Sequence, residues 1–433
     1  MAYRWPMHDA PHPVHLVVED DYRRTRVTVF FRLILAIPHF IWFFLWTVLI
    51  VIAAILNWLI SIFTGKPPRG LHRLMCSYVR YQAHLTAYLA LVGNPYPGFM
   101  GEAGEYPIDI RLPEEPVAQR RWTIFLRLLL AIPALLVSSA LAGLSGGNLG
   151  SGRNKRREGT GGGALLLVCA VLGWFASLAR GRMPKGLRDA GAYSIGYTAQ
   201  ATAYILLVTD RYPNADPTEM LVEVTDRPPQ HPVRVVGDPY DLRRSRLTVV
   251  FRILFALPHI FWLLLWSILV FFVAIAQWFV TLFRGTPAGG LHRFLTRYVR
   301  YRLHVYAYLM LVGNPFPGFT GAAGTYPLDL EVEGPQRQNR WKTGFRIILG
   351  IPSFLVSAAL GGALLSSAVL TWFYALAKGS APWGLRNLSA YALRYDAQVE
   401  AYALLLTDAY PHASPLEGAP SPQHEFAEAP AEA

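Results

Sequence analysis

Long apolar runs, each followed by an amphipathic segment, dominate the pattern of hydrophobic and polar positions along the chain. Between Val27 and Thr64 the only ionisable side chains are Arg32 and His39. A run of this length and composition predicts helix within a membrane, because a buried helix of a soluble protein is shorter and less apolar. The segment that follows, Gly70–Val92, mixes Arg and His with Leu, Tyr and Val and predicts a helix at the membrane interface.

The pattern repeats four times. Each copy carries Arg, three residues, Ala or Gly, Ile or Leu, and Pro, at Arg32–Pro38, Arg127–Pro133, Arg252–Pro258 and Arg346–Pro352. Copies one and three match at an offset of 220 residues, as in His39 and His259, while copies two and four resemble each other. The order is therefore A-B-A-B, which implies a pseudo-two-fold arrangement of the halves. The predicted modules are 1–112 (A1), 113–226 (B1), 227–332 (A2) and 333–412 (B2), followed by a disordered tail, 413–433.

An insertion in copy two decides how we interpret the apolar runs. From the repeated Arg to the Gly-Leu that closes the run is 38 residues in copy one, Arg32 to Gly70, but 59 in copy two, Arg127 to Gly186. The extra residues form a Gly-rich, basic loop at 145–163 that must lie in water. We therefore predict that each run is two helices folded as a hairpin, with about eight membrane crossings in all. Shallow or re-entrant hairpins remain an alternative.

Basic residues at both ends of every run place both termini in the cytoplasm, although the basic loop of copy two would then face outward. Short alternating stretches precede the runs and predict strands of a small extramembrane sheet, at His15–Glu19, Ile108–Leu112, Val233–Val236 and Leu328–Val332. The predicted fold class is an all-α integral membrane protein of four tandem helical-hairpin modules, with interfacial amphipathic helices and short extramembrane β-strands.

Composition and charge support this interpretation. The chain is 53% hydrophobic and only 16% charged, and its net charge of +12 comes from Arg clustered beside the apolar runs, for example Arg23, Arg24 and Arg26. Such placement is typical of positive-inside flanking charge, and with no recognition motif present we do not expect nucleic-acid binding.

The two cysteines, Cys76 and Cys169, predict neither a disulfide framework nor a metal site. The polar stretch before Asp21 lacks the apolar core of a signal peptide, so the first membrane segment is expected to direct insertion.

The repeated arginines are the most prominent candidates for chemistry. A charge inside an apolar run costs a few kcal/mol unless it is satisfied. One interpretation is contact with an anion or a lipid phosphate; the alternative, which we favour, is that the side chains snorkel to the cytoplasmic headgroups. These residues are Arg32, Arg127, Arg252 and Arg346. Six residues after each, a proline predicts a helix kink that serves hairpin packing, at Pro38, Pro133, Pro258 and Pro352.

Histidines of the A copies are the second set of candidates. Pairs among His39, His84, His259 and His304 could hold a haem or a metal, but the B copies carry Gln200 and Gln398 where the A copies carry His84 and His304. Because His and Gln share hydrogen bonding, a structural polar contact at these four positions explains the pattern better, and no cofactor or metal is expected. No Walker, His-Glu-x-x-His, Gly-x-Ser-x-Gly or Cys-x-x-Cys sequence occurs, so we predict no enzyme activity.

Several of these motifs together resemble a known family. Arg-Leu-Ile-Leu-Ala-Ile-Pro-His at 32–39, Phe-x-Gly at 63–65, and Tyr-x5-Ala-Tyr followed by Asp-x-Tyr-Pro are similar to bacterial membrane proteins of the domain-of-unknown-function 4389 family. All four modules fit, although copies two and four lack the His after Pro. The family has no established activity, so the resemblance implies a bacterial inner-membrane location and supplies no catalytic residues.

The leading hypothesis is a non-enzymatic, multi-pass membrane protein with a structural or regulatory role, whose partners are the lipid bilayer, in particular anionic lipids, and a membrane protein or a second copy of the chain. The alternative is a small-solute or ion transporter or channel, suggested by the symmetry and the four arginines but opposed by the lack of intramembrane acidic residues. A redox protein that uses the A-copy histidines is the third hypothesis.

Overall fold

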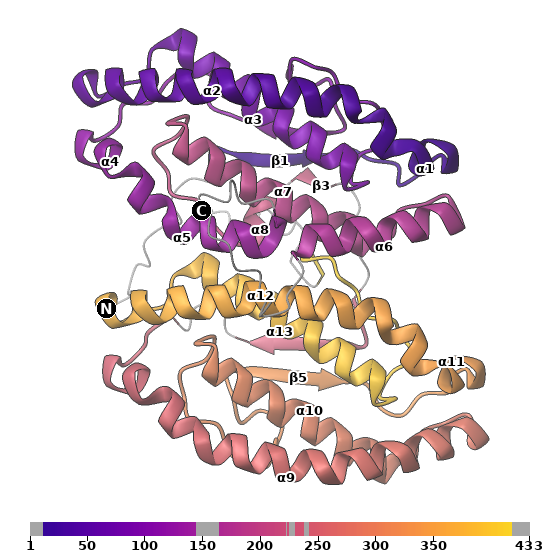
Figure 1. Cartoon of the computed structure of the whole chain (residues 1–433). Coiled ribbons are helices and arrows are strands. Elements are labelled where there is room, and N and C mark those ends of the chain that lie inside the picture. The colour runs from indigo at the N-terminus through magenta and orange to yellow at the C-terminus, as the bar shows by residue number, and fades with distance from the viewer. Residues whose placement is uncertain (1–11, 144–163, 222, 225–229, 238–241, 418–433) are drawn as a thin grey trace, which may run out of the picture.

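The computed structural model describes residues 12–143, 164–221, 223–224, 230–237 and 242–417, and it is mainly helical (Figure 1). The apolar runs form α1 (Arg26–Leu35), α2 (Ile37–Thr64), α4 (Arg121–Phe125), α5 (Arg127–Ala142), α6 (Leu165–Arg180), α9 (Arg246–Arg284), α11 (Arg340–Gly344) and α12 (Arg346–Lys378). The amphipathic helices are α3 (Arg69–Leu89), α7 (Lys185–Ile205), α10 (Gly289–Leu309) and α13 (Trp383–Ala403). Five short strands and one helical turn, α8 (Pro217–Met220), complete the described elements.

In copies three and four a single helix continues through the position predicted for the hairpin tip, so the prediction that each run folds into a two-armed hairpin is wrong. Helix α9 continues for 39 residues and α12 for 33. In copy two, α5 and α6 together correspond to α12, and the helix ends on either side of the insertion adjoin, since a Cβ on Gly143 would lie 2.5 Å from the Cβ of Ala164. The insertion itself lies outside the described residues. The matching positions of copies three and four lie inside the continuous helices α9 and α12. The insertion therefore does not mark a hairpin tip, as the sequence had suggested.

A hairpin does exist in each module, but its arms are the long apolar helix and the amphipathic helix. Helices α2 and α3 are antiparallel, since later residues of α2 contact earlier residues of α3: His39 contacts Tyr81, and Thr47 contacts Tyr78. The turn between the arms is short because Gly65, with φ of 74°, ends α2 in the left-handed conformation. The module therefore packs one side of its long helix, including His39 and Trp46, against the amphipathic arm.

The strands lie on the far side of the amphipathic helices. In the first half β1 (His15–Val18) pairs antiparallel with β2 (Ile108–Arg111) and parallel with β3 (Glu223–Val224). In the second half β4 (Val233–Gly237) pairs antiparallel with β5 (Leu328–Val332). The four predicted strands are thus confirmed, but they form two sheets, one in each half (Figure 1). Each half has three layers in the order long helices, amphipathic helices and strands.

The two halves are stacked through the long helices of the B modules, with α12 packed against α5 and α6 (Figure 1). Within each half the long helices of A and B meet near both ends. In the first half Trp174 Nε1 donates to Val29 O at 3.1 Å, and Trp58 Nε1 donates to Ile124 O at 2.9 Å. The second half repeats both contacts, through Trp372 and Trp278. This repetition agrees with the predicted pseudo-two-fold arrangement.

Only a narrow stripe of each A-module long helix is buried. On α2 the stripe recurs every three to four residues and is partly polar: His39, Trp46, Ile50, Ala53, Asn57 and Ser61. The remaining circumference of α1 and α2 is mostly apolar and exposed, from Val27 on α1 at 65% to Phe63 on α2 at 76%. Among the described residues, three helices have the length and hydropathy to cross a membrane: Ile37–Thr64, Arg246–Arg284 and Arg346–Lys378.

The chain remains ordered beyond the last predicted module. Ser414 is fully buried and its hydroxyl donates to Asp189 Oδ2 at 2.6 Å. Glu417 accepts hydrogen bonds from Gln398 Nε2 at 3.1 Å and from His231 N at 3.0 Å. The prediction that the tail is disordered from residue 413 is therefore wrong for residues 413–417, because Ser414 bonds to module B1 and Glu417 bonds to modules A2 and B2. The rest of the tail lies outside the described residues.

Candidate functional site

Arg32, the first repeated arginine, caps the C-terminal end of the amphipathic helix of its own module. Arg32 is 2% exposed, and its guanidinium lies 4.3 Å from the ring centre of Tyr88. Its Nη1 donates to Tyr88 O at 2.5 Å and to Gly93 O at 3.2 Å. Helix α3 ends just before Leu91, which has a φ of 62°. Arg32 therefore adds side-chain donors to the carbonyl groups at the end of α3, where Tyr88 O also accepts a hydrogen bond from Leu91 N.

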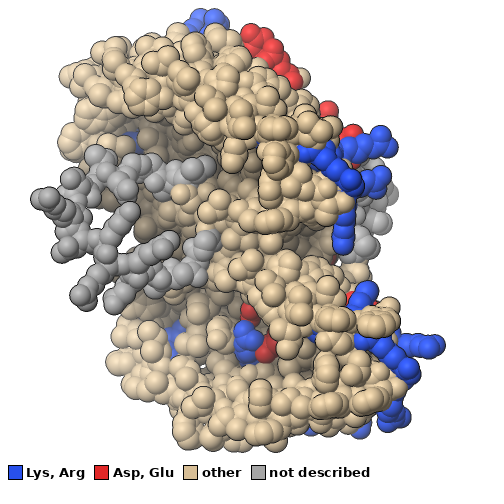
Figure 2. Space-filling model, turned by 45° about the vertical axis from the view of Figure 1, so that its right-hand side comes forward, with Lys and Arg blue, Asp and Glu red and all other residues tan. Residues whose placement is uncertain are grey.

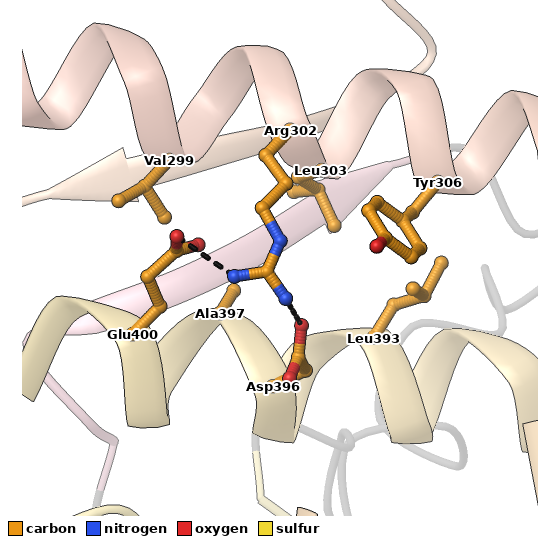
Figure 3. Close-up of a pocket in the computed structure, with 8 residues that line it drawn as sticks. All are labelled: Val299, Arg302, Leu303, Tyr306, Leu393, Asp396, Ala397 and Glu400. Carbon is orange, nitrogen blue, oxygen red and sulfur yellow. Dashed lines mark hydrogen bonds and ion pairs between the residues drawn. The ribbon is translucent and has the colours of Figure 1, made fainter. Parts of the chain in front are cut away.

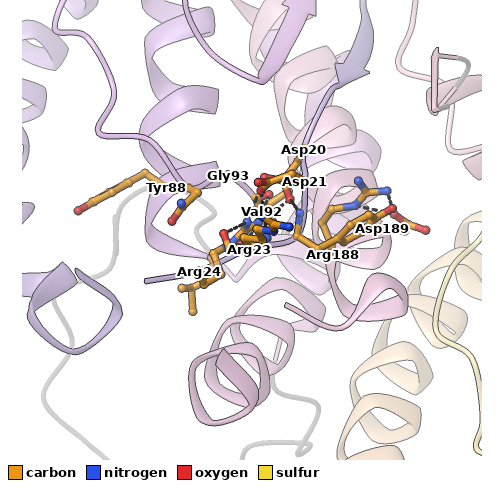
Figure 4. Close-up of polar contacts among 12 residues, drawn as sticks. Asp20, Asp21, Arg23, Arg24, Tyr88, Val92, Gly93, Arg188 and Asp189 are labelled. Carbon is orange, nitrogen blue, oxygen red and sulfur yellow. Dashed lines mark hydrogen bonds and ion pairs between the residues drawn. The ribbon is translucent and has the colours of Figure 1, made fainter. Parts of the chain in front are cut away.

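The guanidinium of Arg24 also contacts the residues at the end of α3. Arg24 Nε donates to Leu91 O at 3.0 Å, and its Nη2 donates to Val92 O at 2.9 Å (Figure 4). The charge of Arg24 is balanced by Asp20, whose Oδ2 lies 2.7 Å from Nη2. Since both side chains of this ion pair are almost completely buried, the left-handed turn at Leu91 is held by two arginines that precede α2 in the chain.

The other three copies reproduce this cap. In A2 the guanidinium of Arg252 lies 4.4 Å from the ring centre of Tyr308 and donates to Tyr308 O at 2.6 Å. In the B modules a glutamine joins the cap: Arg346 Nη2 donates to Gln338 Oε1 at 2.6 Å, and Gln338 Nε2 donates to Leu405 O at 2.7 Å. Module B1 has the same arrangement with Arg127, Gln119, Tyr204 and Leu207.

These contacts give the repeated arginines a structural role. All four side chains, those of Arg32, Arg127, Arg252 and Arg346, are at most 2% exposed and donate to groups of their own module. The interpretation that they snorkel to headgroups is wrong, because their guanidinium groups end at internal carbonyl and amide oxygens. Contact with an anion or lipid phosphate stays a prediction for these positions.

The repeated prolines do not all occupy the same place in a helix. Pro38 is the second residue of α2, just after the break at Ala36 that separates α1 from α2. The other three lie inside continuous helices, Pro133 in α5, Pro258 in α9 and Pro352 in α12. The kink predicted at these positions stays a prediction.

The His and Gln residues in matching positions all make hydrogen bonds with the strand layer or the loops beside it. His84 Nε2 lies 3.1 Å from Asp109 Oδ1, and His304 Nε2 lies 3.0 Å from Asp329 Oδ1. In the B modules Gln200 Nε2 donates to Val14 O at 2.6 Å, and Gln398 Nε2 donates to Val233 O at 3.3 Å. These are contacts of the kind that a structural role requires, since each buried polar group has a partner within the fold.

The remaining A-copy histidines bond to tyrosine. His39 Nδ1 lies 2.9 Å from the hydroxyl of Tyr81, and His259 Nδ1 lies 2.6 Å from the hydroxyl of Tyr301. In the described part of the chain no three His, Cys, Asp or Glu side chains lie close enough together to hold a metal ion. The geometry therefore gives these histidines partners within the protein.

Acid is expected to weaken the attachment of α10 to β5. Burial alone would raise the pKa of Asp329, but hydrogen bonds from Gly324 N, Leu330 N and His304, together with Arg300, hold this pKa below its usual value. A lowered pKa adds stability above pH 4, and this stability is lost as the pH falls through the folded-state pKa. We expect Asp329→Asn to cost about 2 kcal/mol at pH 7 and much less at pH 3.

Chemical unfolding of detergent-solubilised protein at both pH values would measure this loss. The exposed Glu331→Gln on the same strand is the control and should show little loss at either pH. An equal loss for Asp329→Asn at pH 7 and pH 3 would contradict the assignment of the effect to the ionised carboxylate.

A cluster of three charged residues lies in a small pocket between α10 and α13. Arg302 of α10 donates to Asp396 Oδ2 at 2.6 Å, and its Nη1 lies 2.7 Å from Glu400 Oε1 (Figure 3). Ser357 of α12 donates to Asp396 Oδ1 at 2.8 Å. Burial raises the pKa of Glu400, although Arg302 opposes this effect. With both carboxylates ionised, the cluster carries one more negative than positive charge.

The first half has a neutral version of the same pocket. Alignment of the repeats places Gln82 at the position of Arg302, Thr198 at that of Asp396, and Thr202 at that of Glu400. Gln82 and Thr198 line a pocket between α3 and α7, and Ser138, which matches Ser357, lies 3.1 Å from the Thr198 hydroxyl. The halves therefore share the geometry of this pocket but differ in its charge.

Sequence reasoning missed this cluster. Asp396 and Glu400 lie on an amphipathic helix, where acidic residues are expected on a solvated face, and neither belongs to a repeated marker. A position-by-position comparison of the two halves would have found them, since Gln and Thr become Arg, Asp and Glu in A2–B2. The chemistry that this arrangement supports is charge pairing between helices, and the excess carboxylate can take up a proton.

Comparison with known proteins identifies the family. The model of the domain of unknown function (DUF4389) matches four segments, residues 26–101, 162–215, 246–320 and 340–414. These segments cover more than half of the chain, which therefore belongs to this family and contains four tandem copies of its module. No curated protein and no solved structure matches the chain.

Proposed function

We propose that this member of the DUF4389 family is a non-enzymatic membrane protein of the bacterial inner membrane that binds anionic lipid at its basic ends and serves a structural or regulatory role. The single observation that carries the proposal is the exposed apolar surface of the long helices. Along α9 it extends from Leu247, 68% exposed, to Phe283, 71% exposed. An apolar surface of this extent in water would drive aggregation, whereas lipid covers it without cost.

Basic side chains at the ends of the long helices support the choice of an anionic lipid. Arg120 and Arg121 are exposed at the start of α4, next to Trp122, which is 78% exposed. The same arrangement recurs in copy four with Arg340, Trp341 and Lys342. An exposed Trp beside Arg or Lys is typical of the headgroup region, where the indole ring and the cation both find partners.

Replacement of Arg120 and Arg121 by Gln is expected to weaken binding of phosphatidylglycerol about ten- to thirtyfold, because each cation near an anionic surface contributes about 1 kcal/mol. Tryptophan fluorescence of the detergent-solubilised protein, titrated with phosphatidylglycerol or with phosphatidylcholine, would measure the binding. Glu102→Gln, an exposed change of opposite sign, is the control and should not weaken it. Equal affinity of the unmodified protein for both lipids would refute the preference for anionic lipid.

Transport of a small solute or ion is the second candidate function, and the charged cluster of Arg302, Asp396 and Glu400 favours it. Acidic groups between helices are the feature whose absence argued against transport in the sequence. Ion or proton flux into proteoliposomes, compared between the unmodified protein and Glu400→Gln, would test it. Because transport requires a path across the bilayer, it depends on the orientation of the long helices.

A further inference from the structure

We infer that the long helices lie along the membrane plane within one leaflet and do not cross the bilayer. In this orientation the surface formed by α1–α2, α5–α6, α9 and α12 is embedded in lipid, the amphipathic helices lie above it, and the strands face water. The inference rests on the proposed association with a membrane and adds the geometry of that association.

Length is the first argument. Exposed apolar residues extend from Val27 to Phe63 on α1–α2 and from Leu247 to Phe283 on α9. At 1.5 Å per residue each surface is about 54 Å long, whereas the hydrocarbon core is about 30 Å thick. A crossing helix would need a tilt of about 55° to cover this length, beyond the range of roughly 0–40° seen for crossing helices. A helix that lies in the membrane plane contacts lipid along this whole length, because the thickness of the hydrocarbon core does not limit it.

Charge at both ends is the second argument. Exposed basic residues lie at both ends of these long helices. For α1–α2 they are Arg23 and Arg26 at the first end and Lys66 and Arg69 at the second. For α9 they are Arg243 and Arg246, then Arg284, and for α11–α12 they are Arg340 and Lys342, then Lys378. A crossing helix favours basic residues at its cytoplasmic end only. Two basic ends can share one side of the membrane if the run is a hairpin, which the continuous helices exclude, or if the helix lies in the plane.

The layers of the fold are the third argument. The strand layer is polar on its outer side, where Arg111 and Glu331 are exposed. The long-helix layer is apolar, with Phe30, Phe44 and Phe272 each more than 60% exposed. Figure 2 shows a broad face with few charged side chains and, at its right-hand edge, most of the visible Lys and Arg. An apolar face with a basic rim fits one leaflet and its headgroups.

The insertion of copy two agrees with this orientation. In the sequence it lies between α5 and α6, which have 16 residues each, and therefore near the middle of the segment that corresponds to α12. Its sequence contains Arg153, Lys155, Arg156 and Arg157. In a crossing helix this point would lie near the centre of the bilayer, where four cations are very costly. In an in-plane helix the same point lies near the headgroups.

Depth along α9 provides the test. Single cysteines at Leu247, Ile268 and Phe283, all more than half exposed, would be introduced in a chain carrying Cys76→Ala and Cys169→Ala, and spin-labelled in phosphatidylglycerol and phosphatidylcholine vesicles. We expect similar depths at all three sites, about 5–10 Å below the headgroups. A label at Ile268 near the bilayer centre with the other two near the headgroups would overturn the inference.

Sidedness of the two ends of α9 is the second measurement. Ser245→Cys and Thr286→Cys place a thiol just outside each end of the helix, and both are expected to be protected from a membrane-impermeant maleimide in intact cells and labelled after lysis. Labelling of one of the two sites in intact cells would show a crossing and overturn the inference. Failure of the protein to float with any vesicle would instead refute the membrane association itself, so the two failures are distinguishable.

Discussion

Replacement of Arg32 by Leu is expected to lower the free energy of unfolding by about 3 kcal/mol, the largest loss that we expect from a single change in the first module. The substitution keeps an apolar stem but removes the guanidinium that donates to Tyr88 O and Gly93 O. Both carbonyls are buried near the end of α3, where water does not replace the lost guanidinium, although Tyr88 O keeps its hydrogen bond from Leu91 N. The contact between the guanidinium and the Tyr88 ring is lost as well.

The control for this change is Arg73→Leu, since Arg73 is exposed on α3 and is expected to change stability by less than about 0.5 kcal/mol. Arg32→Lys should recover only part of the loss, because a single ammonium cannot reproduce the planar fork. Chemical unfolding of detergent-solubilised protein, followed by far-ultraviolet circular dichroism, would measure all three. Equal stability of the Leu and Arg proteins would refute the capping role and leave contact with a lipid phosphate as the prediction for Arg32.

The repeat pattern was sufficient to predict much of the fold. The Arg-to-Pro marker and the Gly-Leu pair fixed four modules, and alternating stretches fixed four of the strands. Each prediction rested on local periodicity, which the backbone follows directly. The mixture of Leu, Tyr, Arg and His after the first apolar run also predicted an amphipathic helix, which the structure has at Arg69–Leu89.

Contacts between segments distant in the sequence were not predictable in the same way. The partners of Arg32 follow it by 56 to 62 residues, so the sequence revealed an expensive charge but not the helix end that satisfies it. The hairpin prediction failed for a related reason, since both basic ends and the insertion were consistent with two short arms. Only the continuous α9 and α12 show that one long helix pairs with the amphipathic helix after it.

The charged cluster shows how the two halves have diverged within one geometry. Ser138 and Ser357 occupy matching positions and bond to matching partners, Thr198 and Asp396. A neutral pocket in the first half therefore demonstrates that the fold does not need the charges. The cost of burying Asp396 and Glu400 is offset only while Arg302 is present, which makes the cluster sensitive to the loss of one member.

Replacement of Arg302 by Gln, the residue of the first half, is accordingly expected to destabilise the protein by about 2 kcal/mol at pH 8, a value reduced for partial solvent access. Without the cation, two neighbouring carboxylates face each other, and the pKa of Glu400, which burial already raises, should rise further. A raised folded-state pKa means that stability is present at low pH and is lost as the pH rises through that pKa. The loss in Arg302→Gln should therefore be small at pH 4 and largest at pH 8.

The matched control is the triple variant Arg302→Gln, Asp396→Thr and Glu400→Thr, which copies the first-half pocket into the second half. It removes the unpaired carboxylates together with the cation, so most of the stability lost in Arg302→Gln at pH 8 should return, and the pH dependence should disappear. Unfolding of the three proteins in detergent at pH 4 and pH 8 would measure both effects. If the triple variant were as unstable as Arg302→Gln, packing of the Arg302 stem between α10 and α13, and not its charge, would account for the loss.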